Sequence, residues 1–70
     1  MKTLYEVIVG NIGYVYEGPL MKEALETYAE YKRQSMNQYG RAAGEDVTLL
    51  KNHFPVYEYF GTFNEEMIHE

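Results

Sequence analysis

The fold is decided by the stretch from Leu4 to Tyr16, LYEVIVGNIGYVY. Up to Val9 its residues alternate between two faces, with Tyr5 and Val7 on the same side as Val9, as in a half-buried β-strand. Residues 10–13 contain two glycines and an asparagine, which tolerate the positive φ of a tight turn. β-prone residues then resume, so this stretch predicts a β-hairpin.

A helix is predicted directly after this hairpin. Gly18 ends the second strand, and Pro19 suits a first helical turn, where its missing N–H would have no partner anyway. We expect the helix to continue to about Tyr39, with Gly40 as the left-handed residue that ends it. One side of this helix is largely apolar and should face a sheet: Leu20, Met21, Ala24, Leu25, Tyr28, Tyr31, Ser35, Met36 and Tyr39.

The remainder of the chain predicts a second pair of strands. Beyond a loop at 41–46, the segments 47–50 and 56–60 have the composition of strands, and the residues between them separate the two. Residues 64–70 are mostly polar and are expected to form a C-terminal tail of low order. The prediction is therefore one α+β domain over residues 1–63, of order ββαββ, with a four-stranded antiparallel sheet and one helix on one face.

Charge and cysteine content narrow the classes of function. A net charge of −5 over 70 residues repels nucleic-acid phosphates, so direct nucleic-acid binding is not expected. No stretch approaches the roughly 20 apolar residues of a membrane span, and no membrane partner is expected. Cysteine is absent, which leaves no disulfide and is commonest in reducing compartments, so the cytoplasm is the expected location.

The tyrosines suggest an interface. One helix covers only one face of a sheet, and the chain contains 8 tyrosines, which add large contact area and keep a polar tip. We therefore expect a homodimer or larger assembly, because a 70-residue monomer would otherwise expose an apolar patch. The expected interface residues are those on the strands: Tyr5, Tyr14, Tyr16, Tyr57 and Tyr59.

A second candidate site lies at the end of the helix. Ser35 is a polar residue on the apolar side, and the run GRAAGE at 40–45 places Arg41 and Glu45 in a loop of small residues. Together with Asn11 these side chains are candidates for binding an anionic ligand or a partner protein. The alternative is structural: Ser35 bonds a carbonyl of its own helix, Arg41 interacts with the helix end, and the loop only closes the fold.

No arrangement of side chains indicates catalysis. Glu26 and Glu30 lie one turn apart, but on an exposed helix face that offers no cleft. His53 and His69 lack the spacing of metal ligands, and no Ser-His-Asp or Cys-His set can be assembled. We expect a protein that is not an enzyme and uses no metal and no cofactor.

Three segments together resemble a known group. These are GNIGYVY at 10–16, the mid-helix residues Tyr28, Tyr31 and Ser35, and GRAAGEDVTL at 40–49. They are similar to small uncharacterised proteins encoded by tailed bacteriophages and their bacterial hosts. The resemblance covers residues 4–60 and implies a bacterial host cell as the setting, without catalytic residues to carry over. In that group the turn between the last two strands is short and acidic, whereas NHFP stands here at 52–55.

Three functions remain open at this level. The first, which the phage setting favours, is a non-catalytic accessory or anti-defence factor that blocks a host protein or sequesters a small anionic, nucleotide-like ligand. The second is an acidic mimic of nucleic acid that inhibits a DNA-binding enzyme through its carboxylates, although interspersed lysines and arginines interrupt the negative charge. The third is a structural module that forms a homo-oligomer.

Overall fold

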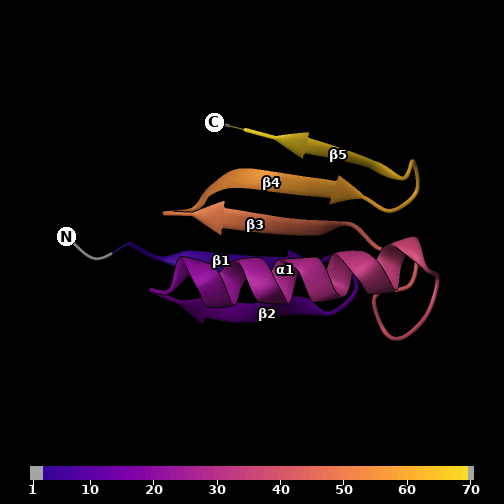
Figure 1. Cartoon of the computed structure of the whole chain (residues 1–70), viewed down its shortest axis with the longest axis horizontal. Helices are drawn as coiled ribbons and strands as arrows, with labels where there is room; N and C mark the ends of the chain where they lie inside the picture. Colours follow the sequence, from indigo (N-terminus) through magenta and orange to yellow (C-terminus); the bar gives the residue numbers. More distant parts are fainter. Residues whose placement is uncertain (1–2, 70) are drawn as a thin grey trace.

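The computed structural model, which describes residues 3–69, is a five-stranded antiparallel sheet with one helix against it (Figure 1). In chain order the elements are β1 (Tyr5–Val9), β2 (Gly13–Gly18), α1 (Met21–Met36), β3 (Val47–Lys51), β4 (Phe54–Phe60) and β5 (Glu65–Ile68). The strands are ordered β2-β1-β3-β4-β5 across the sheet. The predicted α+β class is confirmed, but the sheet has five strands, one more than the four expected.

The additional strand is β5, which lies where a polar tail was expected. Its residues pair with β4 over Tyr57–Phe60, so the backbone gains partners that a free tail would lack. The side chain of Glu66 also reaches the helix, where Lys32 Nζ lies 2.9 Å from its Oε1 and the Tyr28 hydroxyl donates to its Oε2 over 2.6 Å. These tertiary contacts order a segment whose own composition does not predict a strand.

The first hairpin is confirmed, with an irregularity that the alternation pattern does not reveal. In its turn the Ile12 N–H donates to the Val9 carbonyl over 3.0 Å, and Gly13 has a φ of +98°. Val7 pairs with Tyr16 but Ile8 pairs with Tyr14, so Val15 is the extra residue of a β-bulge. The bulge places Tyr14 and Tyr16 on opposite faces of the sheet, although residues two apart in a regular strand share a face.

The helix ends earlier than expected. α1 stops at Met36 rather than near Tyr39, because Gln38 already adopts a left-handed conformation with a φ of +57°. The Gln38 N–H donates to the Ser35 carbonyl over 3.3 Å, and the Tyr39 N–H donates to the Gln34 carbonyl over 3.1 Å. Backbone groups of the last turn are thus satisfied before Gly40, and Tyr39 is left exposed outside the helix.

The second pair of strands is longer than its sequence pattern indicates. Only Asn52 and His53 form the turn between β3 and β4, and both have positive φ, +52° and +71°, as a two-residue hairpin turn requires. Pro55 is tolerated inside β4 because β5 pairs with β4 only from Tyr57 onward. The missing N–H of Pro55 therefore costs no bond to β5.

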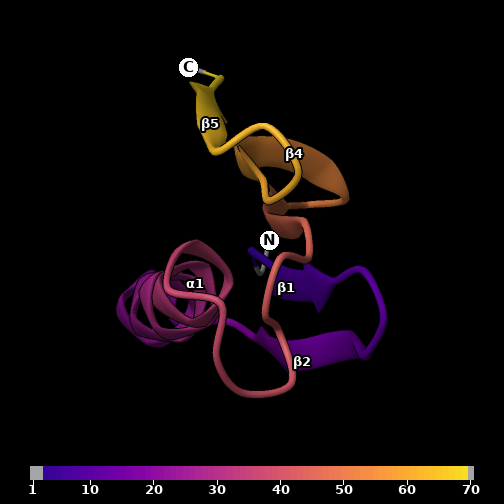
Figure 2. The same cartoon turned by 90° about the vertical axis from the view of Figure 1, so that its right-hand side faces the viewer.

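The helix covers only part of the sheet. It packs against β1, β2 and β3, while β4 and β5 extend beyond it (Figure 2). The core lies between the helix and the sheet, with one residue each from the 40–45 loop and β4, and consists of Tyr5, Val7, Val9, Ala24, Tyr28, Ala42, Val47, Leu49 and Tyr59. Among residues 3–69 no helix is both long and apolar enough to cross a bilayer.

Candidate functional site: a groove beside the outer strands

The strand register assigns the predicted interface tyrosines to faces. Residues paired across antiparallel strands point to the same side, and Tyr57 pairs with Leu49, which in turn pairs with Val7. By the same rule Tyr5, Tyr16 and Tyr59 also lie on the helix side. Of the five expected interface tyrosines only Tyr14 lies on the open face, where it is 64% exposed.

Two of these tyrosines are largely buried. Tyr5 is 8% exposed and Tyr59 is 3% exposed, so both belong to the core. The open face therefore does not carry the Tyr-rich patch that the sequence suggested. The reason is that β1 and β3 place their apolar residues toward the helix, and the bulge at Val15 sends Tyr16 to the same side.

The four candidate binding residues near the helix end do meet, but through backbone atoms. The Ser35 hydroxyl donates to the Glu45 carbonyl over 2.7 Å, in place of the expected carbonyl of its own helix. The Asn11 side-chain amide donates to the Arg41 carbonyl over 3.2 Å. These two bonds connect the 40–45 loop to α1 and to the first hairpin turn.

Packing explains the small residues of this loop. Ala42 is fully buried, and a Cβ added to Gly61 would lie only 2.5 Å from the Gly44 carbonyl oxygen. The Gly61 N–H also donates to Asp46 Oδ1 over 2.9 Å. These contacts support the structural interpretation of the loop, whereas a binding role for the exposed Arg41 side chain remains a prediction.

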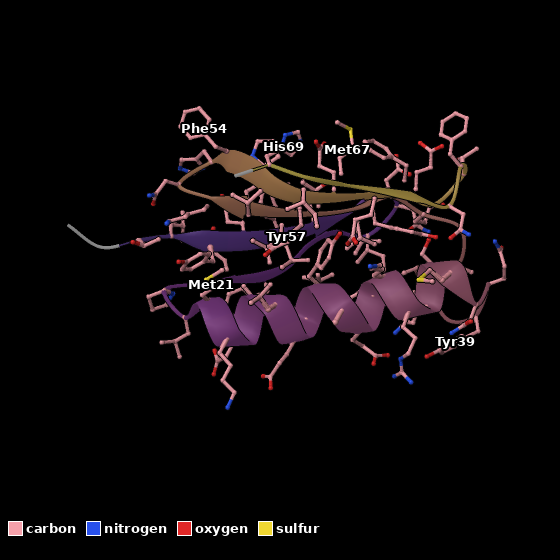
Figure 3. The ribbon with its side chains drawn as sticks, turned by 45° about the horizontal axis from the view of Figure 1, so that its top comes forward. Met21, Tyr39, Phe54, Tyr57, Met67 and His69 are labelled. Atoms are coloured by element: carbon pink, nitrogen blue, oxygen red, sulfur yellow. The ribbon has the colours of Figure 1, made fainter. Side chains whose placement is uncertain are left out.

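A groove of ≈ 290 Å³ lies at the other end of the helix, between Met21 at the start of α1 and Tyr57 of β4 (Figure 3). It is bounded by β1, by the end of β3, by β4, by the last residues of the C-terminal segment and by the first residue of α1. The lining residues are Tyr5, Met21, Lys51, Val56, Tyr57, Ile68 and His69.

Sequence reasoning placed Tyr5 and Tyr57 in an interface and missed the other lining residues. One signal was available in β3, whose sequence is VTLLK. Val47, Leu49 and Lys51 share the helix-facing side, so a lysine stands where the apolar alternation would continue. Ile68 and His69 carried no such signal, because they were assigned to a tail.

Polar atoms in the groove are accessible to a ligand. The hydroxyls of Tyr5 and Tyr57 make no hydrogen bond with another side chain or backbone group within residues 3–69. Lys51 is exposed and forms no ion pair with the described residues. The groove thus combines an apolar, aromatic lining with one cation and two hydroxyls.

A polar network holds the outer strands beside this groove. Tyr28 packs against Tyr57 with ring centroids 5.7 Å apart, and its hydroxyl bonds Glu66. Burial and this hydrogen bond raise the pKa of Tyr28 far above its usual value, so the hydroxyl stays protonated as the donor. Burial alone would raise the pKa of Glu66, but hydrogen bonds from Lys32 and Tyr28 outweigh it and hold that pKa below its ordinary value.

The open face of the sheet carries carboxylates paired with histidines. Glu6 is only 3% exposed and lies 3.1 Å from His53 Nδ1, while Glu58 Oε2 lies 2.7 Å from His69 Nε2. Figure 3 shows His69 on the side of the sheet away from the helix. In the described part of the chain no three His, Asp or Glu side chains gather as metal ligands. The two pairs are separate from each other.

Comparison with protein-family models, curated proteins and solved structures gives no match for this chain.

Proposed function

We propose that this chain is a small non-catalytic binding protein whose groove takes a ligand with a planar, apolar body and an anionic group. A nucleoside monophosphate has both parts. The observation that carries the proposal is the position of Lys51, an exposed cation without an ion-pair partner among the described residues, at a groove lined by tyrosines and aliphatic side chains.

The chemistry of the lining matches such a ligand. Tyr5 and Lys51 are directly paired across β1 and β3, so the two side chains leave the same face of the sheet at neighbouring positions. A flat apolar ring packs well on tyrosine, and a phosphate or carboxylate is attracted by the lysine. The groove volume of ≈ 290 Å³ is at the lower end of small-molecule sites, which suits a single nucleotide better than a larger cofactor.

A role in sequestration follows from this type of site. Capture of a small anionic ligand needs no catalytic residue, and it fits the accessory or anti-defence function that the resemblance to phage-encoded proteins implies. Such a factor would act in the cytoplasm of the bacterial host cell. Blocking a host protein through the same groove is the related form of this proposal.

The nucleic-acid mimic is less well supported by the positions of the carboxylates. Glu30 is paired with Arg33, and Asp46 accepts a hydrogen bond from the Gly61 N–H. Glu23 accepts a hydrogen bond from the Tyr16 hydroxyl. These carboxylates are engaged within the fold, which is unfavourable for a row of free charges that imitates a phosphate backbone.

The proposal can be tested by titrating the protein with AMP and with adenosine and following amide chemical shifts by NMR. Adenosine has the same planar base but lacks the anionic group. We expect AMP to shift the amides of Lys51, Tyr57 and Ile68, and to bind more tightly than adenosine.

Two variants locate the charge contact. We expect Lys51→Gln to remove most of the preference for AMP, a loss of roughly tenfold in affinity, because a charge-assisted contact is replaced by a neutral one. Arg41→Gln is the matched control, since it removes an exposed cation at the opposite end of the helix. Loss of binding in Arg41→Gln with Lys51→Gln unaffected would move the site to the 40–45 loop, and equal binding of AMP and adenosine would refute an anion site at the groove.

A further inference from the structure

The edge of the sheet at β5 exposes backbone groups that no strand covers (Figure 1). The His69 N–H donates to the Val56 carbonyl over 2.8 Å. Every second residue of an antiparallel strand directs its backbone N–H and C=O to the same neighbouring strand. The backbone groups of Met67, two residues before His69, therefore also face β4. The N–H and C=O groups of Glu66 and Ile68 consequently point outward, and all residues of β5 are exposed.

The two edges of the sheet differ in how they are protected. At the other edge β2 contains the bulge at Val15 and packs against α1, and both features discourage pairing with another chain. β5 has a continuous register with β4 and contains no proline or bulge. Its Glu66 carboxylate is held by Lys32 and Tyr28, so its charge is already compensated.

We propose that β5 pairs antiparallel with β5 of a second copy, about a two-fold axis through Met67. A two-fold axis perpendicular to the sheet keeps each side chain on its own face, so facing residues must have the same parity. With Met67 opposite itself, Glu66 faces Ile68 and Glu65 faces His69. The outward backbone groups of Glu66 and Ile68 then form four hydrogen bonds, and Glu65 faces a His69 whose Nε2 lies 2.7 Å from Glu58 of its own chain.

The neighbouring register is less favourable. Placing Glu66 opposite itself would bring like charges together across the strands. It would also require Asn64 to pair with Ile68, although Asn64 has a φ of +53° and has left the strand conformation. Both features favour Met67 over Glu66 as the centre. Because the pairing uses one short strand and each copy carries a net charge of −5, we expect weak, concentration-dependent association.

Cysteine cross-linking tests this register directly, because the natural chain contains no cysteine. In the proposed dimer Met67 is a non-hydrogen-bonded pair with a Cα separation of about 4.5 Å, which is within the range of a disulfide. Met67→Cys should therefore form a disulfide-linked dimer under mild oxidation. Glu65→Cys is the matched control in the same exposed strand, since its two thiols would be displaced by about 13 Å along the strands.

Sedimentation of the reduced, unmodified protein provides the second arm. We expect the dimer fraction to rise with protein concentration. In Ile68→Pro we expect the association constant to fall at least tenfold, because this substitution removes an outward N–H and leaves the bonds to β4 intact. A thermal melt checks that this variant folds, and if it does not, the cross-linking comparison still decides. A monomer at 1 mM, or equal cross-linking rates for the two cysteine variants, would overturn the proposal. Neither arm needs a ligand, so the result is independent of the AMP titration.

Discussion

At the scale of single residues, the most consequential contact is the hydrogen bond between Tyr28 and Glu66. Tyr28 is on the buried side of α1, and Glu66 is on the last strand, 38 residues later. A buried tyrosine would otherwise need another acceptor for its hydroxyl. This one bond therefore satisfies a core residue and attaches β5 to the helix at the same time.

Removal of this hydroxyl gives a stability prediction. Tyr28→Phe keeps the ring but deletes a hydrogen bond to a charged acceptor, so we expect a loss of about 2 kcal/mol in the free energy of unfolding. Tyr39→Phe is the control, because Tyr39 is 44% exposed, and it should change stability by less than about 0.5 kcal/mol. Urea melts of both variants measure the difference, and equal midpoints would show that the hydroxyl of Tyr28 contributes nothing.

At the scale of elements, the first hairpin and the helix were predictable because local residues determine them. Alternation over 4–9 followed by two glycines specifies β1 and its turn, and the apolar periodicity specifies α1. β5 was not predictable, since its sequence EEMI has no clear strand pattern and its order depends on Lys32 and Tyr28. The bulge at Val15 was also hidden, because it arises from cross-strand register rather than from composition.

In the candidate sites, too, some features were visible in the local sequence and others depended on tertiary contacts. The 40–45 loop was recognised as unusual from its composition, yet its small residues are explained by contacts with Gly61 and Ser35 that only the fold reveals. The groove escaped notice because three of its seven lining residues, Lys51, Ile68 and His69, come from segments that were assigned to a turn or a tail. Lys51 alone left a signal, as a cation on the apolar side of β3.

The attachment of β5 to α1 should make stability depend on pH in acid. Since the folded-state pKa of Glu66 lies below its ordinary value, the unfolded chain protonates this group first as the pH falls. The stabilisation is complete above the ordinary pKa of 4.5 and is lost as the pH falls through the lower, folded-state value. Denaturant midpoints of the protein and of Glu66→Gln should therefore differ at pH 7 and converge as the pH falls below the folded-state pKa of Glu66.

A matched substitution controls for general effects of charge in this experiment. Glu26→Gln removes a carboxylate from the exposed side of α1, and it should leave the denaturant midpoint close to that of the unmodified protein at every pH. If Glu66→Gln behaved in the same way, the bonds to Lys32 and Tyr28 would not contribute to stability.

At the scale of the whole molecule, the net negative charge opposes the association of two copies. Each copy carries a net charge of −5, which favours solubility and opposes close approach of two copies. The proposed β5 pairing brings Glu65 of one copy near His69 of the other, at the ends of the paired strands. Added salt should screen the net repulsion between the copies more than it weakens this short contact.

The strand order also has a consequence for the route of folding. β1 lies beside β3, and Val7 pairs with Leu49, so this contact closes a chain segment that contains all of β2 and α1. The hairpins on either side are local and can form quickly, whereas joining them costs the closure entropy of the long segment. We expect Val7→Ala to slow refolding in stopped-flow experiments, and Met67→Ala, at the late-forming edge, mainly to speed unfolding. The seam between β1 and β3 would then set the rate at which the molecule becomes native, and the outermost strand would set how soon it begins to open.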